Sequence, residues 1–141
     1  MKNRYYPSVD KLFYWIAIPT NILFVAALIP MIMLAPEGLT IMIPAIVFTD
    51  YFLISPLFGY VELRDDELFI KYGFFLRKEI PYEKIREVTK ERKVVAYSTL
   101  SLKNALEHIN IKYNKFDMVT VSVNENDDLI KQLNERIKNL S

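Results

Sequence analysis

Two long apolar runs near the start of the chain constrain its fold more than any other feature. No charged residue occurs from Leu12 to Pro36, and Asp50 is the only one from Gly38 to Gly59. Each run exceeds the ~20 apolar residues that a helix needs to cross ~30 Å of hydrocarbon. Because the turn between the runs is short, the second helix must return antiparallel to the first. The sequence therefore predicts a transmembrane helical hairpin over 12–59, with helices over about 12–34 and 39–59.

A cleaved secretory signal peptide is the alternative interpretation of the first run. The apolar region of a signal peptide spans about 7–15 residues and ends at a cleavage site of small residues. The run from Leu12 to Leu34 is longer, and a second apolar run follows it directly. We therefore expect both runs to remain in the protein as membrane spans.

The charges that flank the two runs predict the orientation of the hairpin. Basic residues precede the first run and follow the second, whereas the connecting turn carries only the acid Glu37. Short flanks rich in Lys and Arg stay on the cytoplasmic side. The basic flanking residues are Lys2, Arg4, Lys11, Arg64, Lys71, Arg77 and Lys78. We expect a multi-pass protein of the cell membrane with both termini in the cytoplasm.

From Tyr60 onward the pattern changes to short stretches of alternating apolar and polar residues. Asp65-Asp66, Gly73 and Asn114-Lys115 punctuate them, as turns separate the strands of hairpins. Alternation also places His108 on the polar face of its strand. The expected antiparallel strands cover 60–64, 68–72, 76–80, 85–95, 109–113 and 119–123, with one further short strand between 94 and 106.

A helix is expected after the last strand. Asn124 or Asn126 can cap it, and two aspartates occupy its first turn. Its apolar stripe consists of Leu129, Ile130, Leu133, Ile137 and Leu140. Such a helix closes the open end of a bent sheet or small barrel. The fold class is therefore α+β, divided into a cytoplasmic N-terminal segment (1–11), the helical hairpin (12–59) and a cytoplasmic domain (60–141).

Several segments of the C-terminal part form a pattern that can be compared with known families. They are Leu68-Phe69-Ile70-Lys71-Tyr72-Gly73, Ile80-Pro81-Tyr82-Glu83-Lys84-Ile85, Ser98-Thr99-Leu100-Ser101, Ile109-Asn110-Ile111-Lys112-Tyr113 and Val121-Ser122-Val123. With them, residues 60–133 resemble the bacterial pleckstrin-homology-like (PH-like) domains of membrane-associated proteins. The resemblance implies a partial barrel closed by a C-terminal helix, commonly behind two transmembrane helices. It also implies a binding scaffold without a common ligand.

Asp50 is the only charged residue inside the predicted spans. An acidic side chain near mid-span costs about 2.5–3.5 kcal/mol on insertion scales, so we expect it to face a polar partner or water. Pairing the two helices by depth places Asp50 within one helical turn of Thr20 and Asn21. We expect Asp50 to hydrogen-bond Asn21 and hold the hairpin together. The alternatives are a contact between copies of the chain, and a role in sensing a proton, an ion or a peptide.

A basic series, Lys84, Arg86, Lys90, Arg92 and Lys93, accompanies the longest expected strand. Strand spacing places the first four on one face, where anionic headgroups or a partner can bind. The interleaved acids Glu83, Glu87 and Glu91 favour a solvated strand of mixed charge instead. The resemblance weakens headgroup recognition further, because phosphoinositide-binding relatives carry basic residues in the first hairpin loop. That loop is Arg64-Asp65-Asp66-Glu67 in this chain.

The remaining candidate residues belong to the segment that the family pattern makes most recognisable. Tyr97, Ser98, Leu100 and Ser101 can shape a groove, or their serines can satisfy backbone groups in an irregular connection. His108 is the only histidine and cysteine is absent, so neither a catalytic triad nor a zinc site is supported. We expect no cofactor. The 18 basic and 17 acidic residues nearly balance, which argues against nucleic acid as a partner.

Two hypotheses of function follow. The first is a non-enzymatic binding module, in which the hairpin holds a PH-like domain at the inner leaflet for a protein partner. The second is a small immunity or envelope-stress protein, in which the hairpin itself acts against a membrane-active peptide through Asp50. The lipid bilayer is a partner in both.

Overall fold

The computed structural model describes residues 3–93, 100–102 and 105–140. Two helices, α1 (Lys11–Leu34) and α2 (Leu39–Ile54), form the hairpin and are joined by a 3-10 turn, η1 (Pro36–Gly38). Asp10 caps α1, because its side chain accepts a hydrogen bond from the backbone N–H of Leu12 at 2.9 Å. Helix α2 ends earlier than expected, since Pro56 lacks the N–H that a continuing helix needs and a second 3-10 turn, η2 (Ser55–Phe58), begins there.

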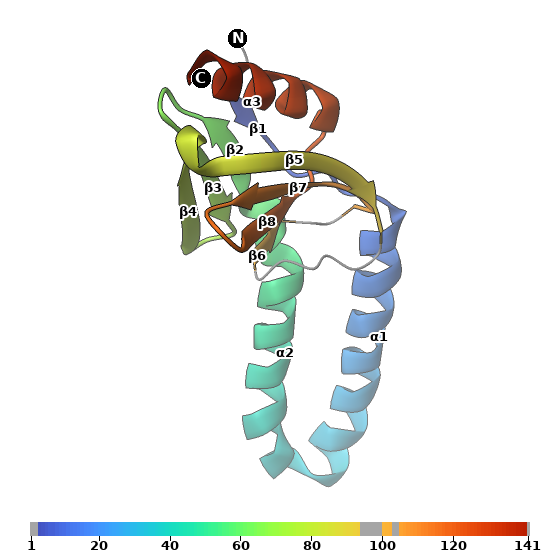
Figure 1. Cartoon of the computed structure of the whole chain (residues 1–141). Helices are drawn as coiled ribbons and strands as arrows, with labels where there is room; N and C mark the ends of the chain where they lie inside the picture. The colour runs from blue at the N-terminus through green and yellow to red at the C-terminus, as the bar shows by residue number, and fades with distance from the viewer. Residues whose placement is uncertain (1–2, 94–99, 103–104, 141) are drawn as a thin grey trace.

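The hairpin keeps its apolar surface outside the rest of the protein. No side chain of α1 or α2 is buried, and apolar residues occupy all sides of both helices. A helix that is apolar all round is typical of a membrane span. The segments Lys11–Leu34 and Pro36–Phe58 are each long and apolar enough to cross a membrane. Both helices extend from the same side of the remaining structure (Figure 1).

The remaining structure, which we call the sheet domain, contains two four-stranded sheets. The first has the order β1 (Arg4–Tyr5), β2 (Tyr60–Leu63), β3 (Glu67–Tyr72) and β4 (Leu76–Pro81). The second has the order β5 (Ile85–Arg92), β7 (Glu107–Tyr113), β8 (Asp117–Val121) and β6 (Leu100–Leu102). A 3-10 turn, η3 (Tyr82–Lys84), joins the sheets. All pairs are antiparallel except β6 with β8, which run parallel.

Helix α3 (Asn126–Leu140) closes the sheet domain at the pole opposite the hairpin (Figure 1). Leu129 and Leu133 are fully buried, while Ile130 and Ile137 pack at the margin of the same core. Their spacing puts these side chains on one face of the helix. The predicted α+β class, with an apolar helical hairpin ahead of antiparallel sheets and a C-terminal helix, is confirmed.

The N-terminal segment forms part of the sheet domain, which sequence reasoning did not anticipate. Arg4 and Tyr5 form β1, and the pairing of Tyr5 with Val61 joins it to the strand that follows the hairpin. Tyr5 is 1% exposed, and its hydroxyl donates to Asp128 of α3 at 2.6 Å. A strand of two residues has no detectable alternation, which is why the segment was expected to stand apart from the domain.

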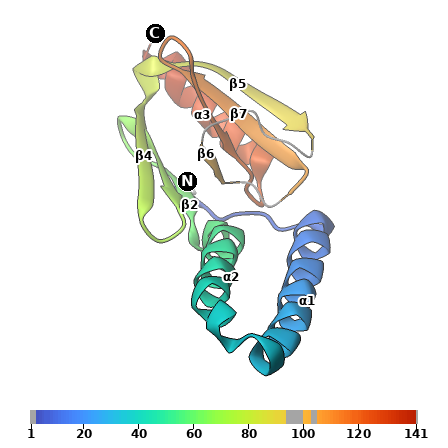
Figure 2. The ribbon, with the colours of Figure 1, turned by 90° about the horizontal axis from the view of Figure 1, so that it is seen from below.

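The same segment then passes to the second sheet. The backbone N–H of Ser8 donates to the carbonyl of Ser122 at 3.0 Å, and Pro7 bridges Val123. Asp10 accepts the backbone N–H of Leu106 at 2.7 Å. Seen from the hairpin side, the segment crosses from α1 towards β2 (Figure 2). Residues on both sides of the hairpin in sequence thus complete one core.

Two predicted turns are confirmed by their backbone. Gly73, between β3 and β4, has φ of 66°, and Asn114, between β7 and β8, has φ of 50°. Glycine and asparagine tolerate this left-handed conformation better than other residues. At Gly73 space is restricted as well, because a Cβ there would lie 2.5 Å from Ser55 Oγ. The turn between β3 and β4 therefore sits directly against the end of α2.

The expected polar orientation of His108 is wrong. His108 is 1% exposed, and Asn110 on the same strand is 7% exposed. His108 Nδ1 hydrogen-bonds the carbonyl oxygen of Leu106 at 2.9 Å, and Asn110 accepts from Thr120 at 2.7 Å. Strand β7 is the second strand of its sheet, with β5 and β8 beside it, so polar side chains on either face can be covered and satisfied locally.

Candidate functional site

The sharpest feature of the hairpin is a polar contact between its helices. Asn21 Nδ2 donates to Asp50 Oδ1 at 3.2 Å, and the same nitrogen lies 3.0 Å from the carbonyl oxygen of Ala17. The structure thus brings Asn21 and Asp50 together at matching depth. A hydrogen bond between spans satisfies polar groups that lipid cannot solvate.

Thr20, the third residue expected at this contact, is not part of it. Its hydroxyl donates to the carbonyl of Ile16 at 2.7 Å, one turn back in α1. Thr49 of α2 does the same to Ala45 at 2.9 Å. Threonine in a membrane helix satisfies its hydroxyl in this way when no neighbouring helix offers a partner. The contact between the helices therefore rests on Asn21 and Asp50.

An apolar groove runs along the hairpin beside this contact. It is a wide, open groove of about 850 Å³ that is lined from both helices and η2. Asn21 is the polar residue in its lining. The other lining residues are Phe13, Tyr14, Ala17, Ile18, Ile22, Val25, Ala26, Ile29, Leu53, Ile54 and Leu57. The groove can hold an acyl chain or an apolar helix, with one amide beside it.

The basic series on β5 does not form the single face that strict alternation predicts. Lys84 lies in the 3-10 turn η3, ahead of the strand. The register of β5 against β7 then shifts between Ile85 and Glu87, so Arg86 and Glu87 are both exposed. A bulge of this kind turns successive side chains out of alternation. The headgroup or partner role of the series stays a prediction.

Several members of the series are already engaged within the sheet domain. Arg86 donates to the carbonyls of Asn114 and Lys115 at 3.1 and 2.6 Å. Lys93 lies 3.3 Å from Glu91. These contacts hold the turn between β7 and β8 and the end of β5, and they leave less free charge on this strand than the sequence suggests.

Lys90 has the strongest attachment of the series. Its Nζ lies 2.8 Å from both Glu107 Oε1 and Asp127 Oδ1. Hydrogen bonds to Asp127 and then Glu107 raise the pKa of Lys90, and the hydrogen bond from Lys90 is the main cause that lowers the pKa of Glu107. Lys90 therefore ties β5 to β7 and to the start of α3, which is a structural role.

The family-motif segment is described only in part. Tyr97 and Ser98 lie outside the described residues. Leu100 and Ser101 belong to β6, whose backbone pairs with Val119 and Thr120 of β8. The expected short strand between 94 and 106 is thus present, as a parallel edge strand of the second sheet.

Sequence reasoning missed an aromatic cluster where α2 meets the sheet domain. Phe74 stacks on Phe58 with ring centroids 4.8 Å apart, and its ring lies 6.1 Å from that of Tyr51. Phe75, beside it in the turn, lies 6.3 Å from Tyr51 and is 82% exposed. Two adjacent phenylalanines directly after a turn glycine were the available signal, because turns usually carry polar residues.

Within the described residues, no group of three or more His, Cys, Asp or Glu side chains could hold a metal ion. Among the ion pairs of the described residues, buried His108 has one carboxylate nearby, Glu91, with Nε2 and Oε2 4.0 Å apart.

Comparison with known protein families identifies the C-terminal part of the chain. The model of a family described as bacterial PH domain matches residues 59–137, more than half of the chain. A search of curated proteins and a search of solved structures each found no match. The matched range begins after the hairpin and ends inside α3. The strands and the helix that it covers are those expected from the resemblance.

Proposed function

Because this chain belongs to the bacterial PH domain family, we propose that it is a membrane-anchored, non-enzymatic binding module. In this proposal the hairpin crosses the cell membrane, both termini are cytoplasmic, and the sheet domain is presented at the inner leaflet to a protein partner. PH-like domains generally bind rather than catalyse. The observation that carries the proposal is the way in which the hairpin is built into the sheet domain.

The hairpin starts and ends at neighbouring positions of one structure. Strand β1 precedes α1, and β2, its hydrogen-bonded neighbour, follows α2. At the other end of the segment, Asp10 both caps α1 and accepts from Leu106. A domain attached through one linker can swing freely, whereas this domain is held at two points. Such attachment fits a module that must present one surface at a fixed height above the bilayer.

The charge distribution supports the cytoplasmic side for the sheet domain. The turn η1 carries Glu37 and no basic residue, whereas Arg4 and Lys11 precede the hairpin and Arg64 and Lys71 follow it. Basic flanks favour the cytoplasmic side. Strand β1, near the start of the chain, and helix α3, near its end, both belong to the sheet domain, so the same side of the membrane is proposed for both (Figure 1).

The absence of cysteine allows a direct test of this orientation. A single cysteine at Glu37→Cys should react with a membrane-impermeant maleimide in intact cells. A single cysteine at Asn139→Cys, in α3, should react only after the membrane is opened. The reverse pattern would overturn the inner-leaflet assignment, and reaction of both positions in intact cells would overturn the membrane hairpin.

We propose the outer edge of β4 as the docking surface for the partner. Among the described residues, β4 is the last strand of its sheet and pairs with β3 alone, which leaves one backbone edge for an added strand. By contrast, the outer strand β5 of the second sheet has α3 across it (Figure 1). An exposed edge strand is a common site for peptide recognition by strand addition.

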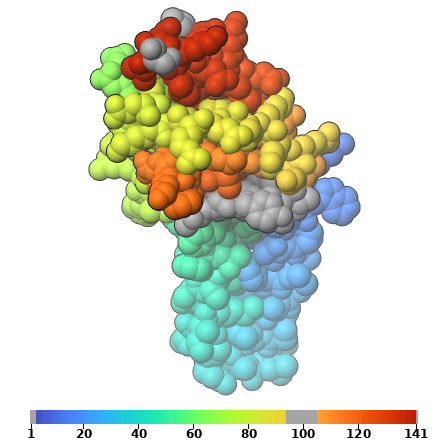
Figure 3. All heavy atoms as spheres, viewed as in Figure 1, coloured from blue at the N-terminus to red at the C-terminus, as the bar shows by residue number. Residues whose placement is uncertain are grey.

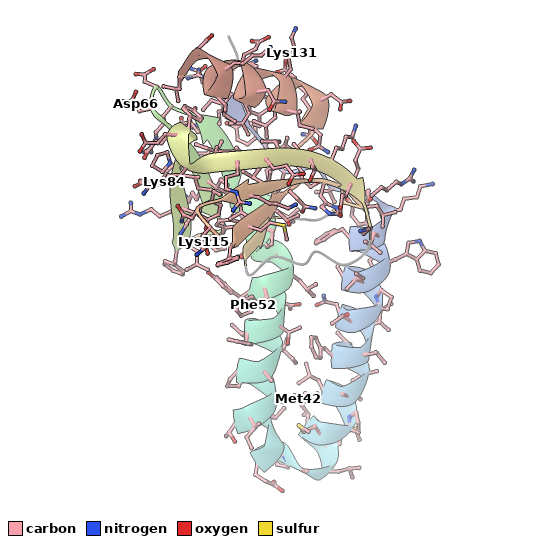
Figure 4. The ribbon with its side chains drawn as sticks, viewed as in Figure 1. Met42, Phe52, Asp66, Lys84, Lys115 and Lys131 are labelled. Atoms are coloured by element: carbon pink, nitrogen blue, oxygen red, sulfur yellow. The ribbon has the colours of Figure 1, made fainter. Side chains whose placement is uncertain are left out.

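Photo-crosslinking in native membranes tests this surface. A benzophenone amino acid replacing Glu79 on β4 should give a covalent adduct with another protein, and the matched position Lys131 on α3 should not. Lys131 lies on α3, at the pole opposite the hairpin (Figure 4). Adducts at Lys131 alone would contradict docking at β4, while adducts at neither position would contradict a protein partner.

The groove of the hairpin favours one second candidate, an immunity or envelope-stress protein that binds a membrane-active peptide. The groove holds about 850 Å³ and places Asn21 beside apolar walls. A discriminating experiment replaces the hairpin with an unrelated two-span anchor. Function that survives the exchange excludes the second candidate, whereas protection from a peptide by the hairpin alone excludes the first.

A further inference from the structure

We propose that the turn between β3 and β4 is a second membrane contact, at which the sheet domain docks on anionic lipid. We call the segment Gly73–Leu76 the aromatic tip; its companions are Lys71, Arg77 and Lys78. The inference goes beyond anchorage by the hairpin, because it assigns a lipid-binding surface to the sheet domain itself. It rests on the membrane position of the hairpin proposed above.

The depth of the aromatic tip is set by its contacts with α2. Phe74 stacks on Phe58, at the end of the apolar segment, and both Phe74 and Phe75 approach the ring of Tyr51. Tyr51 precedes Phe58 by about 10 Å of helical rise. The tip therefore lies beside the last turns of a helix that the bilayer must cover. If the bilayer covers Tyr51 and Phe58, lipid must surround the tip as well.

The exposure of the tip is unusual for a turn in water. Phe75 is 82% exposed, Leu76 54% and Phe74 48%. Apolar side chains presented together at this level favour transfer from water by about 25 cal/mol per Å² of buried area. Aromatic rings also favour the boundary between headgroups and acyl chains. The interface of the bilayer therefore satisfies both preferences, that of apolar side chains to leave water and that of aromatic rings for the headgroup boundary.

The basic residues behind the tip indicate the charge of that surface. Lys71 of β3 stands directly opposite Arg77 of β4, and Lys78 follows. Like charges directly opposite each other on paired strands are destabilising. Between Leu68 and Lys78 the sequence contains no acid, and the described residues show no ion pair to these three basic side chains. Anionic headgroups can supply the missing counter-charge.

The far half of the same sheet is organised differently. There Glu62 pairs with Arg4 at 2.7 Å, and Arg64 pairs with Glu67 at 2.9 Å. Figure 4 shows Asp66 at the end of the sheet remote from the hairpin and Phe52 on α2 close to the sheet domain. Figure 3 shows the broad domain seated on the narrower hairpin. The basic side chains in the far half thus have acidic partners. Beside the tip, Lys71 and Lys78 lie 5.8 and 5.4 Å from the ring centroids of Tyr60 and Tyr113, and the described residues give them no acidic partner.

Spin labels in the full chain, reconstituted in lipid nanodiscs, test the proposal. Single cysteines replace Leu76 at the tip, Leu140 at the far pole and Ile43 in the hairpin, and the chain has no native cysteine to remove. Relaxation by oxygen reports lipid, and relaxation by a water-soluble nickel chelate reports water. In phosphatidylglycerol nanodiscs, the oxygen-to-nickel ratio at 76 should exceed that at 140 several-fold and approach that at 43.

Two sets of variants assign the effect to the proposed residues. The variants F74A/F75A and K71Q/R77Q/K78Q should each lower the oxygen-to-nickel ratio at position 76. The variant K71Q/R77Q/K78Q should lower this ratio in phosphatidylglycerol nanodiscs but not in phosphatidylcholine nanodiscs. The matched variant K131Q/K138Q, on α3, should leave the ratio unchanged. All the substituted side chains of the tip are at least partly exposed, so each variant should keep a cooperative thermal unfolding transition. The transition of F74A/F75A should fall only by the loss of the ring contacts with Phe58 and Tyr51.

Each failure has a distinct meaning. A ratio at 76 as low as that at 140, with a high ratio at 43, overturns lipid docking and leaves the anchorage intact; the tip then faces a protein or water. A low ratio at 43 overturns the anchorage itself. An equal effect of K131Q/K138Q, or an unchanged ratio in both tip variants, shows that these residues do not form the contact and overturns the assignment.

Discussion

The helical hairpin and the sheet domain arrange their apolar residues in opposite ways. In α1 and α2 no side chain is buried, whereas the sheet domain buries a continuous core that includes Tyr5, Tyr82 and Leu133. The hairpin can leave its apolar surface outside only where the solvent is apolar as well. Its helices consequently contact each other through few residues, and a polar pair is prominent among them. The domain depends on burial, and it takes a strand from before the hairpin to complete that burial.

The contrast between the two regions predicts its largest effect at Tyr5, because the sheet domain needs this residue to complete its core. Tyr5→Ala removes a large side chain that is 1% exposed and hydrogen-bonds Asp128. Replacing large buried aromatic residues costs about 3–5 kcal/mol, a major part of the about 5–15 kcal/mol that stabilises a domain. Chemical denaturation in detergent, followed by near-ultraviolet circular dichroism, should show this loss.

Tyr6→Ala is the matched control, since Tyr6 is 56% exposed and lies in the same segment. Equal losses for the two variants would mean that the segment merely lies on the domain. Removal of residues 1–10 should be at least as damaging as Tyr5→Ala, and supplying them through a short linker that replaces the hairpin should restore cooperative unfolding.

Gly73→Ala tests the joint between the two regions. Gly73 has φ of 66°, and a Cβ would lie 2.5 Å from Ser55 Oγ and 2.8 Å from Ser55 Cβ. A strained residue of this kind costs about 1–3 kcal/mol, and the turn must move away from α2 to relieve the contact. Denaturation should show the loss, and ring contacts between Phe74 and Phe58 should weaken in nuclear Overhauser spectra.

The control is Gly38→Ala in the turn of the hairpin. Its φ is −66°, and its Cβ would meet the flexible side chain of Met31 at 3.1 Å. This change should have little effect. If Gly38→Ala proved as costly as Gly73→Ala, the close approach at Ser55 would not be the cause.

The polar pair of the hairpin should contribute less than either of these. A double-mutant cycle with Asn21→Leu and Asp50→Leu should give a coupling of about 0.6–1.7 kcal/mol, the range for hydrogen bonds between membrane helices. Asn21→Leu alone should cost more than the double variant, because it leaves the carboxyl without its partner. Unfolding in bicelles measures both, and Thr20→Val should show no coupling to Asp50. A coupling energy near zero would mean that Asn21 and Asp50 lie at the same depth without stabilising the hairpin.

The smallest effect concerns the Lys90 cluster and pH. The hydrogen bond from Lys90 lowers the pKa of Glu107 below its ordinary value of about 4.5. A lowered pKa in the folded state means that the stabilisation is present above about pH 4.5 and is lost as the pH falls through the folded-state pKa. The stability difference between the parent chain and Glu107→Gln should therefore narrow on acidification, as thermal melts from pH 6 to pH 3 can show. A difference that is constant across this range would contradict the pairing.

Most of the fold could be predicted from the sequence, but the place of β1 in the sheet domain could not. Uncharged length predicted α1 and α2, and Gly73 and Asn114 predicted turns that have the expected left-handed backbone. Strand β1 is too short to show a period, and its place depends on Tyr5 fitting a cavity between β2 and α3. His108 shows the other limit, since alternation predicts polar and apolar faces only where one face meets water.

The candidate site was predictable to a similar degree. Depth pairing of two antiparallel helices brought Asn21 to Asp50, because rise per residue is constant in a helix. The prediction that the basic residues near β5 share one face failed because of a bulge in that strand. The spacing of residues in the sequence does not reveal such a bulge. The aromatic tip could not be predicted from the sequence, because its position depends on contacts with Tyr51 and Phe58. These residues are distant in sequence and approach the tip only in the folded chain.

Because β1 must pair with β2, the sheet domain can fold only if the segments before and after the hairpin are on the same side of the membrane. If the hairpin crosses the membrane as proposed, the ribosome releases β1 first, and this strand must wait until both spans have been inserted before β2 appears on the same side. If only one span crossed the bilayer, Tyr5 and Val61 would be stranded in different compartments and the core could not close. A chain inserted with the wrong number of crossings would thus expose an incomplete barrel, and proteolysis could remove it before it reached any partner.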